Sequence, residues 1–464
     1  MKFREEKDYL GKVKIQKDKY YGIHTKRALK NFPISDYKID STFIKSFAYI
    51  KHAAALTNKE YGYLDSKLAD SIVQACTEIE NGKFHEQIVV DPFQGGAGTS
   101  TNMNFNEVIA NRANEILGYE KGSYSAVDPL DHVNKHQSTN DVFPSALQVA
   151  VLFGLHDLEK EIMKLQDSLQ KKEQTFRHIL KIGRTQLQDA VPVTLGMEFG
   201  AWANAVSRDR WRIFKSRERI KPLNLGGTAV GTGLGAPKKY IFKVVENLKD
   251  LTGLTIARAE NLIDATQNKD SLVEVSGMLK AYGSNLLKIT SDLRLLSSGP
   301  KAGINEISLP RVQKGSSIMP TKINPVILES VSQIALKVIN NDNLVGQIAG
   351  LGNLEINQFL PLMMHTLMET LKILISGTNI LREKCIKGIE ANEKVAKEYA
   401  LNSKTIATIF VPKLGYEKVE HIIKKSIEEN KTIKNVILEE ELMEEDEIDE
   451  MLSPWNMYKL GFDD

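Results

Sequence analysis

The chain has 464 residues, more than a single hydrophobic core usually organises, so two or three domains are expected. Lysine and arginine total 61 and aspartate and glutamate total 59, which leaves a net charge of +2 at pH 7. This balance gives no electrostatic reason to expect nucleic acid or an anionic membrane as a partner, and a small molecule is expected instead.

The N-terminus and the cysteines indicate the compartment. The first residues, MKFREEKDYLGKV, contain no apolar core of the signal-peptide type, and no run of about 18 apolar residues is present to cross a bilayer. The two cysteines, Cys76 and Cys385, lie far apart and show no metal-like spacing. We therefore expect a cytoplasmic protein without a disulfide framework.

Residues 1–140 mix short helices with glycine-rich connections, and we expect them to form an N-terminal lobe. One polar segment in this lobe, GGAGTSTNMNFNE at 95–107, crowds hydroxyl and amide groups around Thr99. Local sequence alone is equally consistent with a binding segment and with a turn that caps a helix.

A second polar segment, DHVNKHQSTND at 131–141, comes directly before a long helical pattern. Ser138, Thr139 and Asn140 therefore lie at a helix start, where free backbone N–H groups bind carboxylates readily. Simple capping is the alternative, and the local sequence does not separate the two. His132 and His136 fit a hydrogen-bonding role better than metal ligation.

Residues 141–390 carry the strongest helical periodicity. Apolar residues three and four apart predict long amphipathic helices over about 142–172, 271–299 and 360–381, and a fourth that begins after Asn324-Pro325. Several such helices in one stretch favour a bundle in which each helix is buried by its neighbours. We expect this stretch to form the central domain.

The central stretch is interrupted by a third polar segment, GSSIMPTKINP at 315–325. It holds two adjacent serines, a lysine and an asparagine. A lysine surrounded by hydroxyl and amide groups can bind a carboxylate, or can lower the free-energy cost of forming a nearby alkoxide. Glycine at 315 and proline at 320 fit a mobile loop with a hinge and a stiff turn.

Residues 391–464 are expected to form a small C-terminal helical domain, and their acidic run EEELMEEDEIDEML is expected to be a solvated helix face.

Other chemistries find little support in the sequence. GTGLGAP at 231–237 lacks the strand that a dinucleotide fingerprint needs. The chain has no Walker loop, no Gly-x-Ser-x-Gly elbow and no metal-like histidine spacing, so no metal site is expected.

The polar segments together resemble the aspartase/fumarase superfamily. Its signature loop GSSIMPxKxN is present at 315–324, and GTSTNMNFNEVIANRA, DHVNKHQSTNDVFP, GRTQLQDAVPVTLG and GGTAVGTGL follow the family order across essentially the whole chain. The resemblance implies an all-α, three-domain lyase that assembles as a homotetramer around a twenty-helix core. Active sites would be built from segments of three subunits, with no organic cofactor required.

The resemblance also implies residue roles in an elimination that gives fumarate from a dicarboxylate substrate. Ser316 would be the base, and Lys322 of the same loop would be the second catalytic residue. The implied substrate-binding residues are Thr99, Ser138, Thr139, Asn140, Thr185, Gln186, Ser317 and Asn324. Ser317, Ser138, Thr139 and Thr99 would surround the carboxylate that gains charge; Lys322, Asn324 and Thr185 would hold the other; and Asn140 and Gln186 would face the leaving group.

Two positions indicate which leaving group is expected. Fumarases of this type usually carry histidine after GRT and glutamate two residues before GSS, whereas this chain has Gln186 and Gln313. The pattern is more similar to the members that convert L-aspartate to fumarate and ammonia. A fumarate hydratase, or a lyase acting on another amino-substituted succinate, is the nearest alternative, and a fold that has lost activity is a more distant one. Lys314, Thr321 and Gly226 depart from the usual pattern near the site, so the reaction class is better supported than the substrate.

Overall fold

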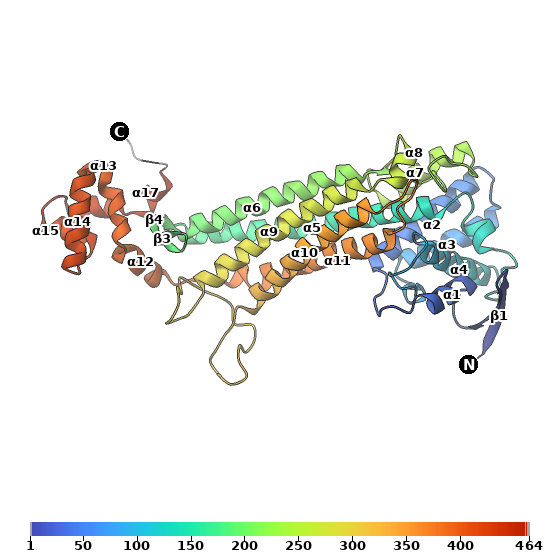
Figure 1. The fold of residues 1–464 in the computed structure, drawn as a ribbon, viewed down its shortest axis with the longest axis horizontal. Helices are drawn as coiled ribbons and strands as arrows, with labels where there is room; N and C mark the ends of the chain where they lie inside the picture. The colour runs from blue at the N-terminus through green and yellow to red at the C-terminus, as the bar shows by residue number, and fades with distance from the viewer. Residues whose placement is uncertain (1, 460, 462–464) are drawn as a thin grey trace. The chain divides into compact units, whose positions relative to one another are not determined.

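The computed structural model describes residues 2–459 and 461, and these residues are mostly helical (Figure 1). The chain divides into two compact units, each assembled from separate stretches: unit 1 holds Met1–Glu159, Trp211–Ala281 and Lys337–Ile375, and unit 2 holds Lys160–Arg210, Tyr282–Leu336 and Ser376–Asp464. Within the described part of the chain, no helix combines the length and apolar character needed to cross a membrane.

The structure confirms the long helices that the apolar periodicity predicts. They are α5 (Thr139–Phe176), α6 (Leu195–Ser216), α9 (Asp270–Leu296), α10 (Val326–Gly350) and α11 (Leu360–Lys384). The boundary between the units falls inside each of them. Because this grouping cuts across the helices, it does not test the expected consecutive domains 1–140, 141–390 and 391–464, which stay a prediction.

Unit 1 also contains shorter elements. They are β1 (Phe3–Asp8), β2 (Gly11–Gln16), α1 (Ile23–Asn31), α2 (Ser41–Glu60), α3 (Ser66–Glu80), η1 (His85–Gln87), α4 (Thr99–Ile116), η2 (Pro129–Val133), η3 (Arg217–Ile220), β5 (Pro222–Leu223), α7 (Lys238–Thr252), β6 (Ala257–Arg258) and α8 (Leu262–Gln267). Strands β1 and β2 pair antiparallel, and β5 and β6 pair parallel.

An aromatic cluster forms the core of unit 1 beneath the polar segments. The rings of Phe47 and Phe105 stack with centroids 4.3 Å apart, and those of Phe43 and Phe143 lie 5.1 Å apart. All four side chains are fully buried. Because Phe105 belongs to α4 and Phe143 to α5, this packing fixes the two helix starts relative to each other.

A buried carboxylate on α4 holds the start of α1. Glu107 accepts hydrogen bonds from the backbone N–H groups of Gly22, His24 and Thr25 at 2.8, 2.7 and 3.1 Å, and from the Thr25 hydroxyl at 2.6 Å. Burial raises the pKa of Glu107 to about 7, while these donors favour the ionised form. A charged acceptor at a helix N-terminus is stabilising because the exposed N–H groups there carry partial positive charge.

We expect Glu107→Gln to lower the free energy of unfolding by about 1–3 kcal/mol, because the amide group replaces an acceptor with a donor that faces backbone N–H groups. Urea unfolding at a fixed protein concentration measures this loss. Glu115→Gln on the same helix is the matched control: its carboxylate is about one-third exposed and pairs with Arg112, so the loss should stay below about 1 kcal/mol. Equal losses for the two variants would contradict the buried cap.

Unit 2 contains parts of all five long helices, cross-linked by buried polar pairs. The Tyr282 hydroxyl lies 2.7 Å from that of Thr378, joining α9 to α11, and the Thr290 hydroxyl lies 2.9 Å from that of Ser332, joining α9 to α10. Between the apolar layers, such paired hydroxyls set the register of one helix against the next.

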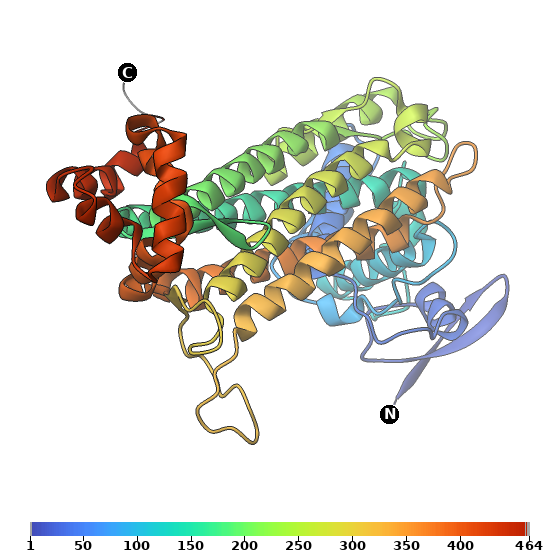
Figure 2. The ribbon, with the colours of Figure 1, turned by 60° about the vertical axis from the view of Figure 1, so that its left-hand side comes forward.

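The other elements of unit 2 follow these helices. They are β3 (Leu180–Thr185), β4 (Gln188–Thr194), β7 (Ile307–Ser308), η4 (Ile386–Gly388), β8 (Glu390–Ala391), α12 (Glu393–Asn402), η5 (Lys404–Phe410), α13 (Val411–Leu414), α14 (Tyr416–Glu428), α15 (Ile433–Glu439), α16 (Glu445–Met451) and α17 (Pro454–Tyr458). Strands β3 and β4 form an antiparallel hairpin, and β7 pairs antiparallel with β8. Figure 2 shows the β3–β4 hairpin beside the C-terminal helices.

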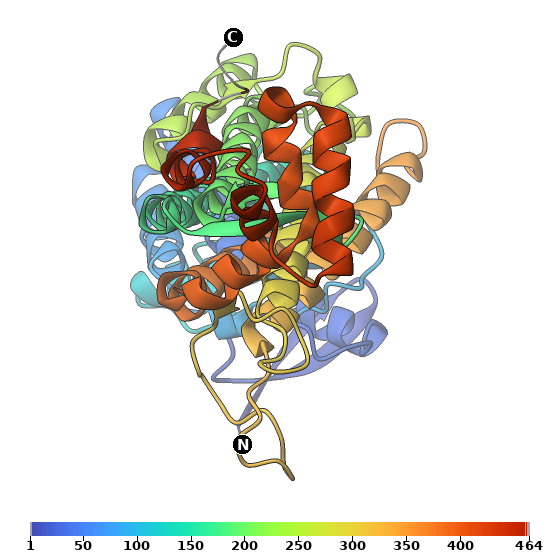
Figure 3. The same cartoon turned by 90° about the vertical axis from the view of Figure 1, so that its left-hand side faces the viewer.

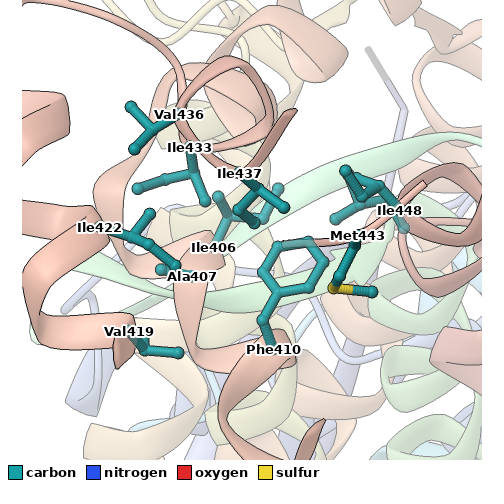
Figure 4. Packing of buried hydrophobic residues seen from close by; sticks show 11 residues of the cluster. Ile406, Ala407, Phe410, Val419, Ile422, Ile433, Val436, Ile437, Met443 and Ile448 are labelled. Atoms are coloured by element: carbon teal, nitrogen blue, oxygen red, sulfur yellow. The ribbon is translucent and has the colours of Figure 1, made fainter. Parts of the chain in front are cut away.

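The C-terminal helices enclose their own hydrophobic cluster. Figure 4 shows Phe410 at its centre, with Ile437 and Ile448 from the following helices turned toward it. The acidic run is largely exposed, whereas its apolar members Met443 and Ile448 are buried in this cluster. The expected solvated helix face is therefore confirmed.

Candidate active site

The first polar segment forms a tight loop followed by the start of α4. Gly96, Ala97 and Gly98 have φ values of 83°, 54° and 95°, all in the left-handed region that glycine adopts most easily. A Cβ added at Gly98 would lie 2.3 Å from the ring of Phe143, so only glycine allows α4 to approach α5 this closely. Thr99 is exposed at the first position of α4, and its hydroxyl donates to the Gly96 carbonyl at 2.7 Å.

The second polar segment caps α5. The Ser138 hydroxyl oxygen accepts the Asn140 N–H at 3.2 Å, and the Ser138 N–H donates to Asp141 Oδ1 at 2.9 Å. Asp141 Oδ2 also accepts the N–H groups of Gly226 and Thr228 at 3.0 and 3.1 Å. This fully buried carboxylate therefore joins the start of α5 to the 224–235 loop. Burial raises the pKa of Asp141 to about 6, although its backbone N–H donors favour the charged form.

The same segment places Thr139 and Asn140. Asn102 of α4 donates to the Thr139 hydroxyl at 3.0 Å, which ties the two helix starts together. Asn140 Nδ2 donates to the Ala229 carbonyl at 2.7 Å, and the Asn140 carbonyl accepts from Asn224 at 2.9 Å. Because its amide nitrogen is held in this way, Asn140 has its Oδ1 available as an acceptor.

A buried lysine contacts the segment that precedes α5. Lys51 Nζ donates to Asn134 Oδ1 at 3.1 Å and to Gln137 Oε1 at 2.9 Å, and the residue is 1% exposed. Burial lowers the pKa of Lys51 to about 7. Neither Lys51 nor Asp141 was assigned a role from the sequence. Asp141 belongs to the quoted segment, but Lys51 lies in an ordinary helix with no local signal.

Thr185 and Gln186 lie at the tip of the β3–β4 hairpin in unit 2. Both are exposed, and Thr185 pairs with Gln188 across the turn. Gln186 and Leu187 form the turn with φ values of 53° and 64°. The hairpin therefore presents a hydroxyl and an amide side by side at its end.

The signature segment forms a loop that closes on its own backbone. The Gly315 N–H donates to the Lys322 carbonyl at 2.9 Å, and Asn324 Nδ2 donates to the Gly315 carbonyl at 2.7 Å. A Cβ added at Gly315 would lie 2.6 Å from the Lys322 carbonyl oxygen. Gly315 is therefore required by the close approach of the two loop ends, and in this structure Asn324 braces the loop.

Inside this loop, Ser316 has an environment suited to negative charge. Its Oγ accepts the N–H groups of Ile318 and Met319 at 3.2 and 3.1 Å. Two backbone donors aimed at one hydroxyl oxygen favour the alkoxide over the neutral group. Ser317 and Lys322 are exposed, and Figures 2 and 3 show the loop projecting away from α9 and α10 in its unit.

The structure thus brings some of the expected residues together. In unit 1, the packing of α4 on α5 gathers Thr99 with Ser138, Thr139 and Asn140. In unit 2, Ser316, Ser317, Lys322 and Asn324 share one loop, and Thr185 and Gln186 share one turn. Convergence of these three groups on one substrate stays a prediction.

The histidines near the second segment have structural partners. His132 Nδ1 accepts the Asp128 N–H at 2.8 Å, and His136 Nδ1 lies 2.7 Å from Asn58 Oδ1. The hydrogen-bonding role expected for both is confirmed. Among the residues that the structure describes, no three His, Cys, Asp or Glu side chains are grouped in a way that could hold a metal ion.

Comparison with protein families gives two matches. The sequence profile described as "Lyase" matches residues 11–340, and that described as "Fumarase C C-terminus" matches residues 406–459. The aspartate ammonia-lyase of Bacillus subtilis (strain 168) is 46% identical over 459 residues, covering 99% of this chain and 97% of that protein. The aspartate ammonia-lyase of Escherichia coli (strain K12) is 44% identical and covers 98% and 96%.

Solved structures show the same relationship. The crystal structure described as fumarate lyase:delta crystallin from Brucella melitensis bound to cobalt superposes with a TM-score of 0.95 at 41% identity, covering 98% of this chain and 99% of that one. A class II fumarase from Schistosoma mansoni superposes with a TM-score of 0.93 at 32% identity, covering 99% of each chain.

Proposed function

The chain belongs to the aspartase/fumarase superfamily and is a lyase of that group, and we propose that within it the chain is an aspartate ammonia-lyase. The observation that carries the proposal is the match to aspartate ammonia-lyases at 44–46% identity along nearly the whole chain. The reaction is the reversible removal of ammonia from L-aspartate to give fumarate.

The chemical difficulty lies in removing a proton from the carbon next to a carboxylate. The carboxylate then gains a second negative charge, and fixed hydrogen-bond donors must stabilise it. Ser316 is the proposed base, and the N–H groups of Ile318 and Met319 on its Oγ support an alkoxide. Closure of the loop over the substrate would exclude water and bring Lys322 near the reacting groups.

The proposed carboxylate site uses the starts of α4 and α5. Thr99, Ser138 and Thr139 lie at these helix ends, where free N–H groups and the helix dipole favour negative charge. With Ser317, they would receive the carboxylate that gains charge. Lys322, with Thr185 and Asn324, would hold the second carboxylate as an ion pair with hydrogen bonds.

The proposed leaving-group site uses two amides. Asn140 has its Nδ2 committed to the Ala229 carbonyl, so its Oδ1 is placed to accept a hydrogen bond from an ammonium group. Gln186 at the exposed hairpin tip supplies a second amide. Neither group titrates, so departure of the amine relies on hydrogen bonding rather than on proton transfer from a side chain.

The second candidate function is fumarate hydratase, or a lyase for another amino-substituted succinate. The superposition on a class II fumarase at 32% identity supports fumarate hydratase as this second candidate. A substrate panel separates the candidates: L-aspartate, L-malate, argininosuccinate and adenylosuccinate, each followed by the ultraviolet absorbance of the fumarate released. The proposed function requires L-aspartate to be the preferred substrate.

We expect Gln186→His together with Gln313→Glu to raise any trace activity on L-malate, while L-aspartate stays preferred by the unmodified protein. The hydroxyl group of L-malate must gain a proton to leave as water, which calls for a titrating partner, and glutamine offers only a fixed donor and acceptor. Initial rates with both substrates measure the change. If the unmodified protein used L-malate as fast as L-aspartate, these positions would not select the leaving group.

We also infer a homotetramer with shared active sites. The proposed site residues fall into three groups carried by α4 and α5, by the β3–β4 hairpin and by the 315–325 loop. The resemblance of the polar segments to the superfamily implies that three subunits contribute one group each.

A further inference from the structure

The β3–β4 turn adopts a backbone conformation that its own residues do not favour. Gln186 and Leu187 both have positive φ, as in the type I′ turns for which Asn-Gly is the usual sequence. Non-glycine residues keep such values only where the surrounding structure holds them. Both side chains are exposed, so the support must come from the strands behind the turn.

One support lies on β3. Arg184 donates from Nη1 and Nη2 to the two carboxylate oxygens of Glu306 at 3.0 and 2.9 Å. Glu306 is fully buried and also lies 3.1 Å from the buried Lys181 Nζ. A bidentate pair fixes the orientation of the guanidinium as well as its position. The Arg184 guanidinium also lies 5.9 Å from the Tyr399 ring centre.

The other support lies opposite, on β4. Asp189 is the cross-strand partner of Arg184, directly behind the Thr185–Gln188 pair that closes the turn. The Ser403 hydroxyl donates to Asp189 Oδ2 at 2.7 Å, and the Thr405 hydroxyl donates to the Ala190 carbonyl at 2.6 Å.

Part of the contact between β4 and the C-terminal helices is open, although the Thr194 hydroxyl lies 3.0 Å from that of Tyr458 on α17. A pocket of about 420 Å³ lies between them, lined by Val191 and Pro192 on the strand and by Thr408 and Ile409 on η5. Where apolar packing is incomplete, hydroxyl contacts such as those of Ser403 and Thr405 carry more of the connection.

We propose that Glu306 and Ser403 are positioning residues that act through Arg184 and Asp189 to hold the turn presenting Thr185 and Gln186. This inference rests on the proposed function, which places those two side chains against the substrate. Arg184 and Asp189 each lie one residue behind the Thr185–Gln188 pair that closes the turn. Loss of either anchor therefore shifts the side chains of Thr185 and Gln186 together. A misplacement of about 1 Å is enough to lower turnover by up to about 10²-fold.

The test uses Ser403→Ala in the full-length protein. We expect kcat/KM for L-aspartate to fall about 3- to 10-fold. Ser426→Ala is the matched control, because Ser426 is a buried serine of the same helical region that bonds Lys404 and Lys431 and not the hairpin. In a Thr185→Ala, Gln186→Ala background, Ser403→Ala should lower the remaining activity less than about 2-fold, since effects on one shared element are not additive.

Hydrogen exchange of residues 183–190 gives a readout that does not depend on catalysis. Exchange should be faster in Ser403→Ala and in Glu306→Gln than in the unmodified protein, and unchanged in Ser426→Ala. Unchanged exchange in Ser403→Ala overturns the inference, as does an equal loss of activity in both backgrounds. A protein that releases no fumarate from L-aspartate contradicts the proposed function itself, whereas an active protein with additive losses contradicts only this inference.

Discussion

Ser316→Ala should lower kcat for L-aspartate by about 10²–10⁴-fold or more, the usual scale for the loss of a positioned base. The substitution removes the hydroxyl whose oxygen receives the Ile318 and Met319 N–H groups, so no group remains there to accept the proton. Initial rates of fumarate formation measure the loss.

The fold should not change in this variant, because Ser316 is only partly buried in a loop that is closed by Gly315, Lys322 and Asn324. The thermal midpoint serves as the control for folding. Ser317→Ala is the matched variant: it removes the neighbouring hydroxyl, proposed to bind and not to take the proton, and should cost less. Near-normal turnover in Ser316→Ala would assign the base to another residue.

Mixed assemblies of Ser138→Ala and Ser316→Ala subunits should be more active than the mean of the two parent variants. Ser138→Ala removes a donor from the proposed carboxylate site, and Ser316→Ala removes the proposed base. If the two serines of one site come from different subunits, random mixing leaves about a quarter of the sites with both. Differently tagged subunits, co-expressed and purified through both tags, give the mixed species, and its rate is compared with that of each parent.

The matched control mixes Ser316→Ala with Ser317→Ala. Both serines belong to the 315–325 loop, so every site receives one defective loop and mixing should give only the mean of the parent rates. Recovery in the first mixture that does not exceed the parental mean would contradict sites shared between subunits.

The long helices could be predicted from sequence because their burial repeats every three to four residues. Residues 142–172 were expected to be helical, and α5 extends over Thr139–Phe176. The hairpins could not be predicted in this way. Strand β1 reads FREEKD and has no apolar alternation, and the β3–β4 turn uses Gln-Leu in place of a turn dipeptide such as Asn-Gly.

The candidate site could be predicted only where its residues cluster along the chain. Ser316, Lys322 and Ser138 lie in polar segments that interrupt apolar helices, and that conflict marked them. Lys51 and Glu306 gave no such signal. Lys51 is one of several polar residues buried along α2, and Glu306 meets Arg184 across 122 residues, a pairing that only the fold creates.

The most direct test of the proposed reaction identifies both products from L-aspartate. Proton NMR of the purified protein with L-aspartate should show fumarate, and an ammonium assay on the same sample should give one ammonium for each fumarate. The same protein with L-malate should give fumarate far more slowly. Fumarate from L-malate at a rate equal to that from L-aspartate, or no fumarate from L-aspartate at all, would contradict the account.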